Sequence, residues 1–356
     1  SWNSSVSSIS GIRESILPEQ PLIYDFREIS AATSGFLLKP HSSSSSSTAW
    51  RGSVRGQDVI IFQRKFRRQM EMAEIVDRLS VICRSHHSSL VKLKGASVSG
   101  NYIYLVYEYV PGASLSDCLR NSRNPNFTVL SNWMSRIRVA SDIAHGLDYI
   151  HNSTGLGFEF VHNHVMSSSI IISEPGLNAK ICHFGTSELC GEIMRQSTDS
   201  MELGRSHSNV KKFEGTSGYM APEFQRNGII TQKCDVYAFG VVILELLSGM
   251  EALKYNIDEN SGSYVKISVV EVARNAVEGG GGGFRQWADK RLRDSYPVDV
   301  AEKLARLALD CVADTPHDRP DMETVVIQLS QMFLESQKWT QNMNVPTDFS
   351  VSLAPR

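Results

Sequence analysis

The sequence predicts an α+β fold with two lobes, a small β-rich N-terminal lobe and a larger α-helical C-terminal lobe. This prediction depends on a change of pattern along the chain. Short β-branched and aromatic runs dominate residues 59–107, a Pro111-Gly112 pair follows, and apolar residues then recur at helical spacing. The expected parts are a flexible tail at 1–23, the N-terminal lobe at 24–110, the C-terminal lobe at 111–337 and a flexible tail at 338–356.

The N-terminal part is expected to be mostly strand. Residues 24–36 predict a short amphipathic helix that leads into the domain. The serine run Ser42–Ser47 has no apolar face and predicts a mobile loop. The other expected elements are strands at Val59–Phe62, Leu90–Leu93 and Tyr102–Tyr107 and a helix at Gln69–Ile82.

The C-terminal part is expected to be helical. Apolar residues three and four positions apart predict one face of a long helix, and they are Trp133, Ile137, Ala140, Ala144 and Leu147. Consecutive glycines at Gly279–Gly283 predict a flexible loop. Further helices are expected at Cys234–Ser248, Val300–Ala313 and Met322–Phe333.

Composition excludes several classes of function. Lys plus Arg number 36 and Asp plus Glu number 38, so no basic excess predicts nucleic-acid binding. The 6 cysteines form no CxxC pair, which indicates free thiols in a reducing compartment. No segment reaches the ~18 apolar residues that a membrane span needs. The chain begins at Ser1, so we expect a piece of a longer protein whose upstream part holds any membrane anchor.

Four motifs occur in an order that carries a family resemblance. They are LVYEYVPGASL at Leu105–Leu115, GTSGYMAPE at Gly215–Glu223, DVYAFGVVILE at Asp235–Glu245 and HDRPDM at His317–Met322. Their order and spacing resemble the protein-kinase signature set over roughly residues 24–335. The residues within these motifs are similar to those of plant receptor-like kinases. The order of the parts and the C-terminal SVSLAPR resemble the lysin-motif subgroup.

The resemblance implies that the residues that hold a kinase fold together are present. Glu223 is expected to form a buried ion pair with Arg319. Asp235 is expected to accept backbone hydrogen bonds from the loop that contains His162. His162 and Phe184 are expected to join the column of side chains that links the two lobes.

The residues that would perform phosphoryl transfer are absent by the same resemblance. No GxGxxG occurs between Phe36 and Val54, so the glycine pattern that lets a backbone approach phosphate closely is absent. Serine hydroxyls of this stretch could still donate to a phosphate, although a disordered turn is the expected role of the serine run. The degenerate positions are Phe62 for the strand lysine, His164 for the base aspartate, Met166 for the nearby lysine, Ser169 for the magnesium-binding asparagine and His183 for the metal-binding aspartate. Magnesium prefers carboxylate oxygens, so we expect no intact catalytic residue and no normal metal site.

Several alternatives remain for substitute residues. Arg64 shares the strand face of Phe62 and is the one candidate substitute for the strand lysine, although a solvated surface charge is the expected role. A weak kinase would need another phosphate clamp, for which Arg64 and Arg51 are the candidates. The helix glutamate aligns with Arg78, or with Glu74 or Asp77 in a shifted register. His164 is a chemically suitable general base, and together with His183 it would suit zinc better than magnesium; two neutral, space-filling histidines are the expected alternative.

Nucleotide binding without a normal magnesium site stays open. By resemblance Glu108 and Val110 lie in the hinge that would contact adenine, and Tyr107 is the gatekeeper. A hydroxyl-rich segment offers phosphorylation candidates, whose alternative role is that of plain loop residues. The candidates are Ser197, Thr198, Ser200, Ser206, Ser208 and Thr216.

These patterns predict a pseudokinase that acts as a scaffold or allosteric co-receptor partner of an active receptor kinase. The alternatives are a weak serine/threonine kinase that uses ATP and a degenerate product without a partner. The resemblance implies a place at the cytoplasmic side of the plasma membrane if the chain is part of a receptor, and in the cytoplasm if the chain is complete.

Overall fold

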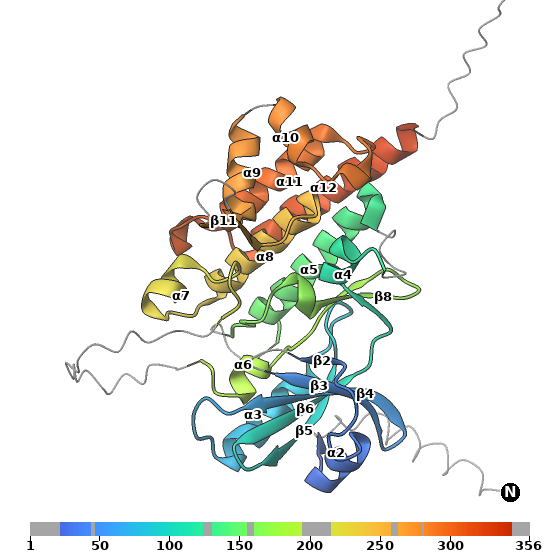
Figure 1. Cartoon of the computed structure of the whole chain (residues 1–356), viewed down its shortest axis with the longest axis vertical. Helices are drawn as coiled ribbons and strands as arrows, with labels where there is room; N and C mark the ends of the chain where they lie inside the picture. The colour runs from blue at the N-terminus through green and yellow to red at the C-terminus, as the bar shows by residue number, and fades with distance from the viewer. Residues whose placement is uncertain are drawn as a thin grey trace, which may run out of the picture.

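A computed structural model describes residues 22–43, 47–123, 130–154, 160–193, 215–257, 263–279 and 281–343. The chain forms two lobes, one built around a β-sheet and one built from helices (Figure 1). The expected two-lobed α+β fold is confirmed. Within the described ranges, no helix is both long enough and apolar enough to cross a bilayer.

The N-terminal lobe is a six-stranded sheet in the order β1-β5-β6-β4-β3-β2. The strands are β1 (Leu22–Ile23), β2 (Ser42–Ser43), β3 (Thr48–Val54), β4 (Gln57–Lys65), β5 (Leu93–Ser99) and β6 (Tyr102–Glu108). All neighbours are antiparallel except β1 and β5. Helix α3 (Met72–Arg84) buries Ile75, Leu79 and Ile82 in the main core.

Helix α2 (Phe26–Ala32) covers the outer face of this sheet. Asp25 begins it with a capping box, because its carboxylate accepts from Arg27 N at 2.7 Å while Glu28 accepts from Asp25 N at 3.0 Å. Ile29 is fully buried in a second, smaller core. The N-terminal segment is therefore part of the sheet lobe from Leu22 onward, two residues before the expected boundary.

The C-terminal lobe is helical, with a small three-stranded sheet at the junction of the lobes. Its strands are β7 (Gly112–Ser114), β8 (Ile170–Ser173) and β9 (Ala179–Ile181). Its α-helices are α4 (Leu115–Arg120), α5 (Trp133–Asn152), α6 (Thr186–Leu189), α7 (Pro222–Asn227), α8 (Gln232–Ser248), α9 (Val269–Glu278), α10 (Gly281–Trp287), α11 (Val298–Cys311) and α12 (Met322–Met343). Short 3-10 turns are η2 (Ser167–Ser169), η3 (Lys290–Leu292) and η4 (Pro316–Asp318).

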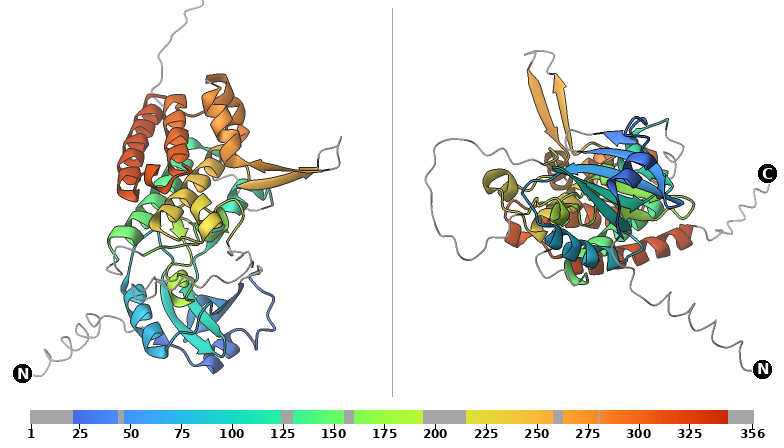
Figure 2. Two further views of the ribbon diagram at one scale, coloured as in Figure 1. Left: turned by 90° about the vertical axis from the view of Figure 1, so that its left-hand side faces the viewer. Right: turned by 90° about the horizontal axis from the view of Figure 1, so that it is seen from below.

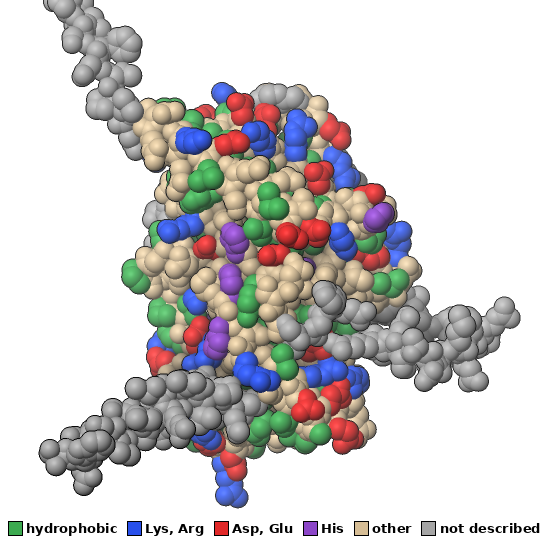
Figure 3. Space-filling view, turned by 180° about the vertical axis from the view of Figure 1, so that it is seen from behind, with side chains coloured by type: hydrophobic (Ala, Val, Ile, Leu, Met, Phe, Trp, Pro, Cys, Tyr) green, Lys and Arg blue, Asp and Glu red, His purple; other side chains and the backbone are tan. Residues whose placement is uncertain are grey.

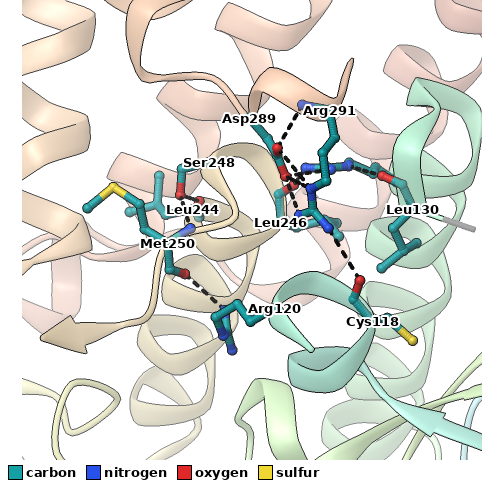
Figure 4. A network of polar contacts seen from close by, with 10 residues as sticks. Cys118, Arg120, Leu130, Leu244, Leu246, Ser248, Met250, Asp289 and Arg291 are labelled. Carbon is teal, nitrogen blue, oxygen red and sulfur yellow. Dashed lines mark hydrogen bonds and ion pairs between the residues drawn. The ribbon is translucent and has the colours of Figure 1, made fainter. Parts of the chain in front are cut away.

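Helix α8 is the centre of this lobe and is buried along nearly its whole length, with α5, α9 and α11 packed around it. Gly240 allows the close approach of α11, since a Cβ there would lie 2.8 Å from Ala308 O. The buried Arg136 ties neighbouring elements together, and its partners Leu130, Leu246 and Asp289 are labelled in Figure 4. Arg136 donates to Leu130 O at 2.6 Å, to Leu246 O at 2.6 Å and to Asp289 Oδ2 at 2.7 Å.

A two-stranded hairpin, β10 (Leu253–Ile257) and β11 (Tyr264–Ser268), projects from the helical lobe (Figure 2). It was not predicted.

Two other expectations were wrong. Gly281–Trp287 is helix α10 rather than loop, and α12 runs to Met343, so the helix continues past the expected start of the tail at 338. Tertiary packing overrides the low helix propensity of glycine in α10, where Phe284 is fully buried.

The loop prediction for Ser42–Ser47 and the strand prediction for Leu90–Leu93 were also partly wrong. Ser42 and Ser43 pair with Ala49 and Thr48, because backbone pairing needs no apolar side chain. Leu90 forms only an isolated bridge with Ile181, and the strand itself begins at Leu93.

Candidate functional site in the cleft between the lobes

Aromatic rings occupy the position where the strand lysine and the metal-binding aspartate were expected. Phe62 on β4 meets His183, which follows β9, edge to face with ring centroids 4.6 Å apart. Tyr107 on β6 packs against Phe62 at 5.8 Å, and His164 lies 5.9 Å from His183. Four residues from different elements therefore form one ring cluster, called here the aromatic cluster.

The aromatic cluster does not fit a magnesium site. The expected metal positions hold His183 and Ser169, and neither supplies the carboxylate oxygen that magnesium prefers. Burial lowers the pKa of His183 well below its ordinary value, and the charge of Arg64 adds to this effect. In the described part of the chain no three His, Cys, Asp or Glu side chains are arranged to hold a metal ion.

Arg64 lies inside the cleft. Its side chain is 7% exposed, and within the described ranges its Nε has no hydrogen-bond partner. The expectation of a solvated surface charge was therefore wrong. Arg64 and Phe62 share one face of β4, and on this face Phe62 meets His183 of the aromatic cluster.

A carboxylate from the segment after α6 reaches the catalytic-loop position. Glu192 accepts hydrogen bonds from His164 Nε2 at 2.9 Å and from Asn163 Nδ2 at 3.2 Å. Burial alone would raise the pKa of Glu192, but the charge and hydrogen bond of His164 and the charge of Arg64 lower it to about 2. His164, at the position of the expected base aspartate, is thus already paired with a carboxylate of the same chain. This contact between His164 and Glu192 is called here the Glu192 latch.

The ion pair made by helix α3 has the reverse polarity of the one expected in a kinase, because α3 supplies the basic partner. Arg78 on α3 pairs with Glu188 on α6, and with Glu74 at 2.7 Å. Arg68 also pairs with Glu74. A basic side chain on α3 therefore holds the segment after His183 against the sheet lobe, and no side chain on α3 is paired with Phe62.

The gatekeeper position is locked to the same segment. Tyr107 Oη donates to Phe184 O at 2.8 Å and lies 3.1 Å from Thr186 Oγ1. Burial raises the pKa of this phenol. The neighbouring Glu108 accepts from Lys92 N at 3.2 Å, and Val110 packs against the main core.

The residues expected to hold the fold lie in well-paired positions. Arg319 Nη1 and Nη2 donate to Glu223 at 2.7 and 2.8 Å. Asp235 accepts from His162 N at 2.7 Å and from Asn163 N at 2.8 Å. The ring of Phe184 lies 5.4 Å from that of Phe160 in the same core.

One buried polar network was missed by sequence reasoning. Glu245 on α8 is fully buried and accepts from Tyr219 Oη at 2.6 Å and from Ser167 Oγ at 3.0 Å, while Arg120 pairs with it at 2.9 Å. Tyr219 and Glu245 both belong to the recognised motifs, and this was the signal from which the network could have been predicted. The network fixes the end of the segment at 215–223 against the helical lobe.

Most phosphorylation candidates lie outside the described residues, namely Ser197, Thr198, Ser200, Ser206 and Ser208. Thr216 is described and exposed, and its hydroxyl lies 3.6 Å from Met166 Sδ. The side chain at the expected lysine position is therefore an apolar thioether beside a surface hydroxyl.

Comparison with known proteins gives consistent relationships. The protein tyrosine and serine/threonine kinase family matches residues 46–329. LysM domain receptor-like kinase 3 of Arabidopsis thaliana is 33% identical over 331 residues, which are 90% of this chain and 48% of that protein. Protein LYK5 of the same plant is 30% identical over 344 residues, 95% of this chain and 47% of its own length.

The chain spans about half the length of these curated relatives. Among solved structures, the pseudokinase domain of BIR2, an immune regulator of the RLK/Pelle family, has a TM-score of 0.67 at 22% identity, covering 95% of this chain and 98% of that one. That likeness concerns the fold. Together with the two-lobed architecture and the ordered motifs, the matched range shows that the chain belongs to the protein tyrosine and serine/threonine kinase family and has its relatives among plant LysM receptor-like kinases.

Proposed function

We propose that the chain is a pseudokinase domain of a receptor-like protein, which acts as a scaffold or allosteric partner of an active receptor kinase at the cytoplasmic face of the plasma membrane. One observation carries the proposal. The buried pairs that hold the fold are complete, whereas the catalytic positions form the aromatic cluster and the Glu192 latch.

Phosphoryl transfer depends on positioned charge. A kinase places a lysine on the α- and β-phosphates and carboxylate or amide oxygens on the metal ions. Here the corresponding side chains are Phe62, His183 and Ser169, which cannot compensate polyphosphate charge with a metal. A cation close by, Arg64, is buried near the internal carboxylate of Glu192.

The first experiment measures nucleotide binding and turnover on the same preparation. Thermal shift with ATP is recorded with magnesium and with EDTA, followed by phosphate transfer to a generic protein substrate. We expect no magnesium-dependent shift and no transfer. A shift that requires magnesium, together with transfer above background, would overturn the proposal.

The scaffold role needs a separate measurement. The chain is immobilised, and binding of the kinase domain of an active LysM receptor-like kinase is recorded with and without ATP. We expect binding that does not depend on nucleotide. The Phe62→Ala variant is the matched control, because it opens the aromatic cluster without touching the outer surface. Absence of binding in both the wild type and Phe62→Ala would remove the partner role and leave a degenerate domain.

A weak kinase is the second candidate, and one contact favours it. His164 is hydrogen bonded to Glu192, and a histidine oriented by a carboxylate is a recognised form of general base. Such a kinase would show slow transfer that His164→Ala abolishes. Transfer that persists in His164→Ala would exclude this role for the histidine.

A further inference from the structure

A pocket lies where the loop after α3 meets β9 at the junction of the lobes. Its volume is about 300 Å³. The floor is apolar, formed by Leu90, Val91 and Phe184, and the walls are rich in hydrogen-bond donors. The polar lining consists of Ser85, His86, His87, Ser88, Lys92, Glu108 and Lys180.

Lys180 is poorly satisfied in this pocket. Its ammonium has three donors, and its contacts are 3.4 Å to Leu90 O and 3.6 Å to Glu108 Oε1. Charge-assisted hydrogen bonds between ammonium and carboxylate are usually about 2.7–2.9 Å long. Lys180 on β9 is therefore able to bind a better acceptor, and its side chain is 24% exposed.

His87 adds a donor with a defined orientation. Its Nδ1 accepts from Ser89 N at 3.1 Å, so the proton of the neutral ring lies on Nε2. The ring stacks on Tyr149 of α5 with centroids 5.1 Å apart. The charged and titratable groups facing it are His145 and Asp148 of α5 and Lys180 of β9.

The balance of charge in the lining favours an anion. Two lysines and one carboxylate line the pocket, and two histidines add ring nitrogens to it. The carboxylate, Glu108, already accepts from Lys92 N at 3.2 Å. Figure 3 shows histidine side chains gathered in a column on one face, near the level at which the lobes join. A phosphate offers three acceptor oxygens and up to two negative charges, which matches several convergent donors.

We propose that this pocket binds a phosphate monoester, carried by a phosphorylated serine or threonine side chain of another protein. The volume is at the lower limit for ligand pockets and fits a single phosphorylated side chain. The inference goes beyond the scaffold role, because it assigns a ligand chemistry to a site outside the aromatic cluster.

Binding here would act on both lobes at once. Val91 N donates to Ile181 O at 3.0 Å, and Ile181 N donates to Ser89 O at 2.8 Å, so the pocket spans the backbone contacts that join the two lobes. A phosphate bridging Lys180 and His87 links β9 of one lobe to the α3–β5 loop of the other. The expected consequence is a more rigid hinge.

The test uses the whole chain and a fluorescein-labelled peptide, Ala-Ala-phosphoserine-Ala-Ala, with its unphosphorylated form as the comparison. Fluorescence anisotropy is measured for the wild type, for Lys180→Ala and for Lys338→Ala, an exposed lysine on α12 that serves as the matched control. We expect phosphate-dependent binding that Lys180→Ala weakens about tenfold or more and Lys338→Ala leaves unchanged.

Two arms identify the source of the phosphate. Inorganic phosphate that displaces the peptide only at far higher concentration supports a protein-borne phosphate, and equal potency assigns the site to the free anion instead. A histidine titration by NMR on the wild type needs no variant, and bound phosphopeptide is expected to raise the pKa of His87. Equal binding of both peptides, equal loss in both lysine variants or an unmoved His87 titration would each overturn the proposal.

Discussion

In the helical lobe, Arg319 meets Glu223 through two short hydrogen bonds, and Asp235 accepts from two backbone amides of the catalytic loop. In the cleft between the lobes, Phe62, His183 and His164 are packed ring against ring at positions that phosphoryl transfer needs for charge. The first region keeps both of these buried polar pairings, whereas the second has exchanged charge for ring packing.

The difference indicates that the helical-lobe pairs hold this fold without the charged residues that a kinase carries between the lobes. A buried ion pair that loses one partner leaves an uncompensated charge, so such pairs are retained as long as the domain must fold. Phe62 and His183 contribute ring packing and take part in no ion pair with the described residues, so they are outside this constraint. The cleft can fill with rings and an internal carboxylate while the architecture persists.

The largest expected effect comes from breaking the helical-lobe pair. Arg319→Ala should lower the free energy of unfolding by about 3–5 kcal/mol, because Glu223 is left buried without its partner. Arg319 also donates to Ala313 O at 2.7 Å and to Lys233 O at 2.9 Å, and these carbonyls would be left without it. Urea denaturation measures the change. A loss below about 1 kcal/mol would contradict the structural role given to this region.

The helical-lobe residues were predictable because each belongs to a motif in which neighbouring residues are also constrained. Glu223 lies in GTSGYMAPE and Arg319 in HDRPDM, so resemblance indicated both partners of one contact. The degeneracy of the cleft was predictable for the same reason, since a motif also defines which positions have changed. The amphipathic helices were predictable from apolar periodicity, which α5 and α11 display.

The internal contacts of the cleft were not predictable from the sequence. Arg78 and Glu188 are 110 positions apart, and no periodicity or motif pairs them. Glu192 follows the last recognised motif residue of its segment, and only the path of the chain after α6 brings it to His164. Arg64 was assigned to solvent because strand alternation gives the face of a side chain but not what covers that face.

A smaller effect is expected from the Glu192 latch, and it should depend on pH. The pKa of Glu192 is about 2 in the folded chain, against an ordinary value of 4.5. A depressed pKa means that the ionised carboxylate stabilises the fold above pH 4.5 and loses this contribution as the pH falls toward 2. Glu192→Gln should therefore cost up to about 3 kcal/mol near neutrality.

Urea denaturation of the wild type and Glu192→Gln at a series of pH values measures this dependence. The difference between the two proteins should shrink below about pH 4.5. Glu271→Gln on α9 is the matched control, because this carboxylate is exposed and its substitution should give a small difference at every pH. A difference between wild type and Glu192→Gln that stays constant with pH would mean that the latch does not stabilise the fold through its charge.

The smallest effect tests whether burial, rather than the contact itself, distinguishes the two classes of pair. Lys303 and Glu335 meet at 2.8 Å, as close as Arg319 and Glu223, but their side chains are 54% and 45% exposed. Lys303→Ala should change the free energy of unfolding by about 0–1 kcal/mol, and added salt should reduce even that. If Lys303→Ala costs as much as Arg319→Ala under the same conditions, the distance between the charged atoms alone would set the energy of the pair. A several-fold smaller cost would show that water already solvates the exposed partner, whereas the buried Glu223 has little water to take the place of Arg319.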